Sequence, residues 1–509
     1  MSPLRILIPT AQSSSELTEW RVFLTFVVGL SLAACSGPGR FVAGGNQGGG
    51  SGLIVTLRAT PLSPPSNINL LSFRTTVAGI SLTPSTGGSV SVPLNSDLYR
   101  VDLTRLQSDT AFLAFSNAIP AGTYTSMVIS FSNPSVTFCT QTQGITGCAE
   151  RSVSTLSGGP AIQVITAAPF PLVVTRGQSI GLAVNVNVAK ALTVDGQTQA
   201  IGSVNLGAAD ALTVGMLPPS SSTLPSSALD FIEDVTGVVS SVDAAKQTVT
   251  IETATKGSIT AIAGPLTTVS PNCNTFNLGS TFTCAAQGQV ASLETVLNAD
   301  GTFALLEYDP LGITAGDWIE GVIGLPPSSS TQFQLVTNDL VLEPANSLIG
   351  NNLELGAPVS VTLVNPRPFV VDTKGLVVPS SSFSGATDAS VLTPGQTLAV
   401  HVVSFAPASG ATPAAASVDF VYLRFTRVTG SVASAAPPNT FAMQSFPSFF
   451  GLTVNATVQL SSGSNFDGIT VAGDLVSGQT ASIRALYFGP PTGPTPTPTP
   501  FSAAKVRIH

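Results

Sequence analysis

Apolar and polar residues alternate along much of this chain, and a period of two is that of a β-strand. The run SIGLAVNVNV (179–188) keeps the period strictly, and LIVTLRAT (53–60) keeps it at its start. Val, Thr, Ser, Gly and Pro are abundant, whereas Lys, Glu and Met are scarce. Because this composition favours strands and turns over helices, we predict an all-β fold.

Turn signals separate the strands of the first half. The four residues Ser85–Gly88 (STGG) lie between two apolar runs and predict a hairpin. Ile119–Tyr124 (IPAGTY) predicts a turn that leads into a strand at 126–131. A short helix is expected near Leu103–Gln107. Residues 53–216 therefore form the first predicted domain.

Two features of this domain resemble a known family. They are the PAGTY turn and the late strand that follows Arg176-Gly177-Gln178. Both resemble the domain of unknown function 4382, which is a β-sandwich module of bacterial lipoproteins. The resemblance implies a β-sandwich but no activity, since the family has none established. Asn185 and Asn187 replace the aspartates that the family leads us to expect, which places any acidic or metal role there in doubt.

The second half repeats a strand, a turn and a returning strand. The three copies start at Val235, Ile319 and Val428. Each copy has a glycine inside a β-branched stretch, and these are Gly237, Gly321 and Gly430. The pattern resembles the domain of unknown function 5666, a small β-barrel module found in tandem in envelope proteins. The resemblance implies OB-like barrels, which we expect at 230–318, 319–425 and 426–509.

Pro, Ser and Thr tracts mark the boundaries of these modules, because they cannot form a core. Residues 217–229 (from LPPSSSTLPSS onward) are expected to link the sandwich to the barrels, and 491–500 (PTGPTPTPTP) to form a loop of the last one. After that loop, 503–509 (AAKVRIH) has strand character. We predict that it returns to pair near 480–488, the alternative being a frayed tail.

The N-terminal region is typical of an exported lipoprotein. Arg21 precedes the apolar run Val22–Ala34, which is too short to span a bilayer but suits a signal peptide. The run ends in Leu32-Ala33-Ala34-Cys35, which resembles the bacterial lipobox. The resemblance implies a cleaved signal peptide at 1–34 and acyl chains, palmitate among them, on Cys35. A short buried helix with a chance cysteine is the alternative.

Other residues near the predicted cleavage site bear on the expected cellular location. Residues 35–52 form a Gly-rich, lipid-anchored tether. Glu16 and Glu19 lie in a long leader, which a translation start placed too early explains. Ser36 follows the cysteine, and by resemblance to the best-studied sorting system it favours the outer membrane. We expect a location in the cell envelope, facing the periplasm or the surface.

Four cysteines remain after Cys35, in two local pairs nine and eleven residues apart. Export implies an oxidising compartment, in which such pairs form disulfides. We predict Cys139–Cys148 and Cys273–Cys284. A zinc site would require CxxC spacing or histidines, and neither accompanies these cysteines.

Charge argues against several functions. The chain has 19 basic and 27 acidic residues, a net charge of −8, and only 9% charged residues in all. The basic residues are scattered, so no nucleic-acid partner is expected. The acids are also scattered, so no carboxylate pair is predicted. Asp300-Gly301 is interpreted as a hairpin turn, not a calcium loop, because the downstream Glu of such a loop is missing.

No catalytic residue emerges from the motifs. Gly177–Gly181 (GQSIG) matches a nucleophile elbow around Ser179, but that motif needs a following helix and a catalytic histidine. The pattern after Ser179 is that of a strand, and the two histidines are His401, within an expected strand, and His509. We therefore expect no enzyme, no cofactor and no metal.

The aromatic residues leave the function open. Trp318 is the single tryptophan after the predicted cleavage site. Phe446, Phe449 and Phe450 form either an apolar patch or internal packing. We expect a non-enzymatic envelope protein with a structural or adhesive role, built as an extended stalk of tandem modules with an envelope polysaccharide or protein as its partner. Alternatives are a lipoprotein that binds a glycan or small molecule and, less favoured, an enzyme with an unrecognised carboxylate site.

Overall fold

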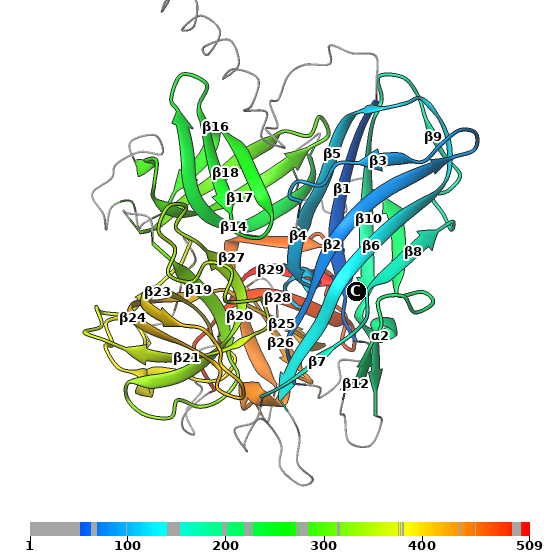
Figure 1. Cartoon of the computed structure of the whole chain (residues 1–509). Helices are drawn as coiled ribbons and strands as arrows, with labels where there is room; N and C mark the ends of the chain where they lie inside the picture. The colour runs from blue at the N-terminus through cyan, green and yellow to red at the C-terminus, as the bar shows by residue number, and fades with distance from the viewer. Residues whose placement is uncertain are drawn as a thin grey trace, which may run out of the picture. The chain divides into compact units, whose positions relative to one another are not determined.

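The computed structural model describes residues 51–509, apart from 63–68, 98, 140–152, 196–200, 218–223, 225–227, 271–272, 274–283, 313–315, 375, 377, 379–380, 437–438, 453–454 and 491–499. Strands make up most of the described chain, and its single α-helix, α2, has four residues (Val188–Ala191). The predicted all-β class is confirmed (Figure 1).

The first domain has two main sheets. One sheet has the order β13-β10-β1-β5 and consists of β13 (Leu212–Met216), β10 (Ser179–Asn187), β1 (Ser51–Thr60) and β5 (Ala111–Ile119). The other is built on the long strands β2 (Leu70–Pro84) and β6 (Gly122–Cys139). Its shorter strands are β3 (Val90–Val92), β4 (Tyr99–Asp102), β7 (Val153–Ser157), β8 (Ala161–Ile165) and β9 (Leu172–Val174). A separate hairpin joins β11 (Leu192–Val194) to β12 (Ile201–Val204).

Several local predictions for this domain agree with the structure. Ser85–Gly88 joins β2 to β3, whose register pairs Leu82 with Val90. The expected short helix is a 3-10 turn, η1 (Arg105–Gln107). One boundary is wrong, because Ser51 and Gly52 belong to β1 and not to a tether: the Ser51 hydroxyl donates to the carbonyl of Thr175, and Gly52 pairs with Ser179.

The second half contains three five-stranded modules with one pairing scheme. The first is a closed barrel of β14 (Ala228–Asp243), β15 (Thr248–Thr253), β16 (Gly257–Val269), β18 (Phe303–Gly312) and β17 (Val290–Asn298). The second has β19 (Trp318–Ile323), β20 (Gln332–Val341), β21 (Pro358–Leu363), β24 (Ala414–Arg424) and β23 (Thr397–Ala406), with the two-residue β22 (Val370–Val371) beside β24. The third is a closed barrel of β25 (Thr426–Ala436), β26 (Thr440–Gln444), β27 (Ala456–Asp467), β29 (Phe501–Ile508) and β28 (Thr480–Tyr487).

Among the five barrel strands of each module, the third and fifth pair in parallel, and every other neighbouring pair is antiparallel. The short β22 pairs in parallel with β24. The β21–β24 pairing closes the second module in the same way as β16–β18 and β27–β29 close the others. These pairings agree with the small β-barrels expected for this half. Two boundaries shift, since β14 starts at Ala228, and Trp318 belongs to the second barrel through its pairing with Val341 and His401.

The repeated glycines have a shared steric cause. Each lies in the first strand of its barrel, directly against a carbonyl oxygen of the second strand. A Cβ atom would approach that oxygen to 2.2 Å at Gly237, 2.5 Å at Gly321 and 2.6 Å at Gly430. Real Cβ atoms do not come so close, so only glycine permits this strand pairing. The sequence repeat therefore marks a close approach between the first two strands of each barrel.

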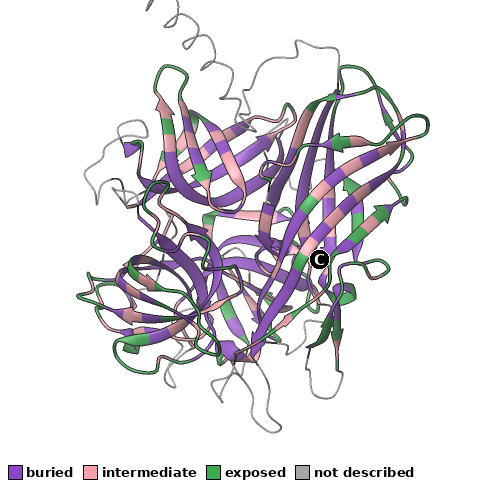
Figure 2. Ribbon diagram, in the orientation of Figure 1, coloured by how far each residue is buried: buried purple, intermediate pink, exposed green. Residues whose placement is uncertain are grey.

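The C-terminal segment completes the third barrel. Strand β29 pairs with β28 in antiparallel register from Tyr487↔Phe501 to Ala481↔Ile508, so the predicted return of 503–509 is confirmed. Figure 2 shows that burial is nearly continuous along β28 and β29, in contrast to the alternating burial of β8. Among the described residues, no helix is long and apolar enough to cross a membrane.

Candidate functional site

Charged side chains from the sandwich and all three barrels meet in one buried ion-pair network, which we call the charge hub. It contains seven basic and eight acidic residues connected by ion pairs: Arg105, Asp109, Glu233, Asp234, Lys256, Glu294, Asp309, Glu320, Asp339, Asp372, Lys374, Arg424, Arg427, Arg484 and Lys505. These acids and bases are scattered along the sequence, and the fold brings them together in space. Residues far apart in the sequence meet there because the sandwich and the three barrels contact one another at this place.

The first barrel supplies mostly acids to the hub, and a bulge in β14 explains why. The pairing of β14 with β17 shifts register between Ile232 and Val235, so that Glu233 and Asp234 lie opposite a single residue of β17, Glu294. Asp234 adopts a left-handed backbone conformation with φ of 50°. Asp is among the few residues that tolerate this conformation. The bulge thus places two adjacent carboxylates inside the junction.

The third barrel supplies only bases, and a short connection between barrels positions them. Strand β24 ends at Arg424 and β25 begins at Thr426, so Phe425 is the whole link. Arg424 and Arg427 on either side of it both reach Asp234. The Arg484 guanidinium lies 4.9 Å from the Phe425 ring centre, within cation–π range.

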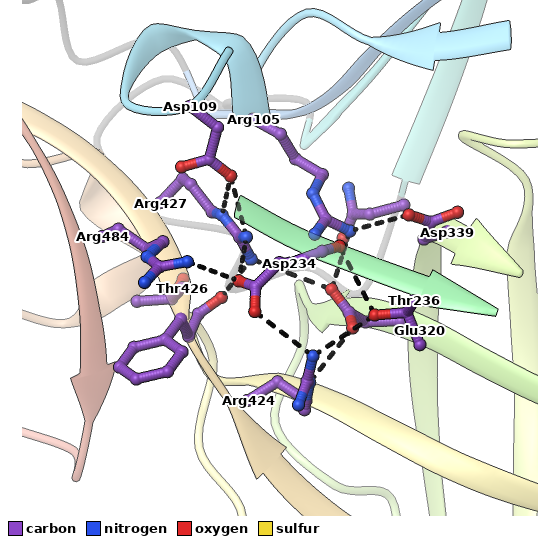
Figure 3. A network of polar contacts seen from close by, with 12 residues as sticks. Arg105, Asp109, Asp234, Thr236, Glu320, Asp339, Arg424, Thr426, Arg427 and Arg484 are labelled. Atoms are coloured by element: carbon purple, nitrogen blue, oxygen red, sulfur yellow. Dashed lines mark hydrogen bonds and ion pairs between the residues drawn. The ribbon is translucent and has the colours of Figure 1, made fainter. Parts of the chain in front are cut away.

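Asp234 is the centre of the hub (Figure 3). Its carboxylate accepts from Lys374 at 2.6 Å and from Arg427 at 2.5 Å, with Arg484 at 3.3 Å. Arg424 adds a fourth contact at 3.4 Å. The Asp234 side chain is 1% exposed, and burial alone would raise its pKa. The surrounding cations, Lys374 and Arg484 foremost, outweigh burial and hold the pKa of Asp234 well below its usual value.

The sandwich joins the hub through η1 and the residues after it. Arg105 contacts Glu320 of the second barrel at 2.7 Å, and Asp109 contacts Arg427 of the third barrel at 2.8 Å. Lys256 of the first barrel contacts Asp339 of the second barrel at 2.6 Å. Every module therefore shares at least one buried ion pair with another.

Two aspartates of the hub share one cation. Arg424 donates to Asp372 and lies 3.7 Å from Asp309, and both carboxyl side chains are at most 1% exposed. Burial, reinforced by the negative charge of Asp309, raises the pKa of Asp372 well above its usual value. This shift favours the neutral form of Asp372 over the charged form that an exposed aspartate would adopt.

A second pair of acids lies at the side of the hub. Glu294 and Glu307 are directly opposite each other on the antiparallel strands β17 and β18. Lys374 at 2.5 Å and Arg484 at 3.1 Å pair with Glu294. Burial, opposed in part by Lys374, raises the pKa of Glu307 to about 7. Glu307 is thus the carboxyl of this region that changes charge near neutral pH.

The space beside the hub is small. Two cavities of about 40 Å³ each border it, one lined in part by Arg105, Glu320 and Arg427, the other by Glu233, Asp234 and Lys256. Such volumes accommodate a few water molecules. Ligand sites usually measure about 300–1,000 Å³. The hub therefore lacks room for a substrate at these two places. Its ion pairs connect one module to the next.

The residues tested for catalysis from the sequence lie apart from the hub. Ser179 begins β10, and a strand follows it, so the nucleophile-elbow geometry is absent there. His401 lies in β23, with its Nδ1 atom 2.6 Å from Asp419. The imidazole of His509 contacts the hydroxyl of Ser482 at 2.9 Å, and burial lowers its pKa to about 3. The structure does not bring these three residues together into a triad.

The aromatic candidates are internal. Trp318 is 4% exposed and packs on His401, Phe420 and Tyr422. Phe446, Phe449 and Phe450 are buried in the core of the third barrel, and Phe450 also lies against Gly395 of the second barrel. These positions agree with internal packing and not with an exposed platform for sugars.

The cysteine predictions are confirmed in part. Cys273 and Cys284 form a disulfide with a Cα–Cα distance of 5.7 Å. Cys139 is disulfide-bonded, and its predicted partner Cys148 lies outside the described residues. Cys35, the signal peptide at 1–34 and the loop at 491–499 are also outside them.

The remaining candidates have local structural roles. Asp300 accepts from the backbone N–H and hydroxyl of Thr302, and Gly301 has a φ of 85°, as a hairpin turn requires. Asn185 donates to Thr60, and Asn187 caps α2. No group of three or more potential metal ligands converges among the described residues.

Sequence reasoning missed the hub, although one signal was present. FIEDVTG (231–237) and RFTR (424–427) place charges within apolar strands, where charge is costly unless it is paired. Comparisons with family models, with curated proteins and with solved structures found no match to this chain.

Proposed function

We propose that this chain is a non-enzymatic lipoprotein of the cell envelope, held by lipid on Cys35, with a structural or adhesive role. The observation that carries the proposal is the charge hub. Fifteen of the chain's 46 charged residues (19 basic plus 27 acidic) are used to join modules internally. Modules joined in this way keep their exposed faces in a fixed orientation relative to one another, which suits a structural or adhesive role.

The hub changes the expectation of an extended stalk. Independent modules on an extended stalk would share few contacts, whereas here ion pairs connect the sandwich with each barrel, with Arg58–Asp230 joining it to the first, and connect the barrels with one another. The proposed role is therefore that of a single body whose modules are held together and which presents several faces. Few charged residues remain outside the hub for the size of the chain, and exposed hydroxyl side chains such as Ser85 and Thr86 are available to a polysaccharide or protein of the envelope.

Two measurements test the proposal. Cells that express the chain are grown with labelled palmitate, and the body is located by membrane fractionation. The wild-type chain is expected to carry label and stay with the membrane, and Cys35→Ser to lose both. Label on the Cys35→Ser variant would refute the anchor. Affinity capture from intact cells then tests the adhesive role, which turnover of a captured small molecule would contradict.

A second candidate function is the binding of a glycan or small molecule. A groove of about 400 Å³ on the second sandwich sheet favours it, lined in part by Ser81, Ser91, Asp97 and Ser130. Hydroxyls and one carboxylate are suited to hydrogen-bonding a polar ligand. Ser91→Trp would fill the groove, and Ser360→Trp on an exposed strand of the second barrel is the control. Binding to a glycan array that Ser91→Trp alone abolishes would favour this candidate over the structural one.

A further inference from the structure

We propose that the groove on the second sandwich sheet binds an uncharged polysaccharide, which crosses the strands from the groove onto a row of exposed aliphatic side chains. This inference rests on the second candidate function, since it names the class of glycan that the groove would bind and the path of that glycan over the sheet. Three observations carry it: the register of β3, β2, β6 and β8, the exposure of Ile162 and Val164, and the charge of the groove lining.

The groove continues into exposed aliphatic side chains along a row of directly opposite residues. The row crosses β3, β2, β6 and β8 in this order and consists of Ser91, Ser81, Val128 and Val164. Opposite residues of neighbouring strands lie on the same face of a sheet, and successive residues of one strand lie on opposite faces. Because Ile129, the residue after Val128, belongs to the core of the sandwich, the row faces away from that core.

A second row beside the first shows the same change from polar to aliphatic residues. Gly79 of β2 is opposite Ser130 of β6, which is opposite Ile162 of β8. Gly79 has no side chain, and a Cβ atom there would lie 3.3 Å from the hydroxyl oxygen of Ser130. The missing side chain leaves this part of the face hollow. The two rows together therefore have a hollow end with serine hydroxyls and an aliphatic end on β8.

The aliphatic end of the rows is strongly exposed. Ile162 is 70% exposed and Val164 is 58% exposed, whereas Ile165 of the same strand is buried. Figure 2 shows this alternation along β8. Burial of apolar surface contributes about 25 cal/mol per Å², so a ligand that covers these two side chains gains affinity from them. Neighbouring exposed apolar residues beside a groove are typical of a binding site.

The charge of the lining selects the class of ligand. Among the described residues that line the groove, Asp97 carries the only charge. A phosphate, a sulfate or a uronic acid would meet this carboxylate without a base from the described lining to pair with. The hydroxyls of Ser81 and Ser130 can donate and accept hydrogen bonds. Val128 offers an apolar contact for the C–H groups of a sugar ring. An uncharged sugar therefore matches the lining.

The pairing of the strands favours a polysaccharide over a peptide. Ser81 and Val128 each have a strand partner on both sides, so their backbone groups are used within the sheet. A peptide strand adds to a free sheet edge, which this face does not provide. Four strands span three spacings of about 4.8 Å, or about 14 Å, which is longer than a single sugar ring. A ligand that touches both ends of the rows is therefore a polymer of sugars.

The first test measures the class of ligand. The full chain with Cys35→Ser, in which lipid on Cys35 has no part, is applied to an array of uncharged, acidic and cationic glycans together with apolar peptides. We expect binding to uncharged polysaccharides. A preference for acidic glycans would overturn this inference and leave the candidate function standing. The absence of binding to every glycan would refute both, and binding to the peptides alone would do the same.

The second test locates the polysaccharide on the rows. Ile162→Ser combined with Val164→Ser removes the aliphatic end and leaves the groove unchanged, and both positions are exposed. We expect the Kd for the polysaccharide to rise about tenfold or more, because two aliphatic contacts are lost. Val173→Ser is the matched control, since Val173 is 60% exposed on β9 and lies outside both rows. It should bind as the parent chain does. Equal affinity of the double variant and the parent chain would overturn the inference, even if the groove itself binds a glycan.

Discussion

The interiors of the barrels and the junction between them are held together by different forces. Each barrel encloses apolar side chains, as in the first barrel, where Val249, Ile251 and Leu293 are fully buried. The junction is equally buried but consists of ion pairs around Asp234. Apolar packing tolerates many arrangements of similar volume, whereas a network of paired charges fits one. The difference indicates that the cores stabilise the modules and the hub selects how they join.

Removal of the central charge should have the largest effect. We expect Asp234→Ala to lower the free energy of unfolding by about 3–5 kcal/mol, because it leaves several buried cations without their shared partner. Ile251→Val, which removes one methylene from the core of the same barrel, should cost about 0.5–1.5 kcal/mol. Urea unfolding followed by tryptophan fluorescence and circular dichroism measures both. A smaller loss for Asp234→Ala than for Ile251→Val would reverse the comparison.

The Glu307 carboxyl should make the junction sensitive to pH in a way that the cores are not. The pKa of Glu307 is about 7 in the folded chain, against an ordinary value of 4.5. As pH rises from about 4.5 to 7, the unfolded chain loses this proton before the folded chain does, so the free energy of unfolding falls. We expect the melting temperature to fall by a few degrees over this window from this group, and Glu307→Gln to remove that fall. Thermal unfolding at several pH values provides the test. An identical pH profile for the two chains would show that Glu307 does not titrate as stated.

Asp372→Asn should have a small effect despite its complete burial. The raised pKa of Asp372 favours its neutral form, and an asparagine amide has nearly the same shape and also lacks charge. We expect a change of less than about 1 kcal/mol in the free energy of unfolding, compared with about 3–5 kcal/mol for the ionised Asp234. Denaturant unfolding distinguishes the two, and a large loss in Asp372→Asn would mean that Asp372 is ionised in the hub.

A charge pair on the surface should contribute the least to the free energy of unfolding among the groups compared. Lys246 lies 3.0 Å from Asp243 at a turn, and its side chain is largely exposed. We expect Lys246→Ala to change the free energy of unfolding by less than about 0.5 kcal/mol. The same unfolding assay should place this variant within error of the wild-type chain, while a loss comparable to that of Asp234→Ala would show that burial is not the deciding factor.

The sequence predicted the strands better than their assembly. Period-two runs, Gly-containing turns and the three repeats depend on neighbouring residues, so SIGLAVNVNV and the glycine at position 237 could be interpreted locally. The hub could not, because Asp109 and Arg427 are 318 residues apart in the chain, and no pattern near either one identifies the other. Register also escaped prediction, since the β14 bulge that turns Glu233 and Asp234 inward depends on pairing with β17.

The position of β1 has a mechanical consequence. This first strand is central in its sheet and runs parallel to β10 along nine register pairs, from Gly52↔Ser179 to Thr60↔Asn187. A pull on the chain ahead of Ser51 therefore acts along the strands and loads the hydrogen bonds of this ladder together, in shear. A pull on a hairpin end would break its bonds one after another at much lower force. Tension applied at that end of the sandwich would therefore meet a ladder that resists it as a unit.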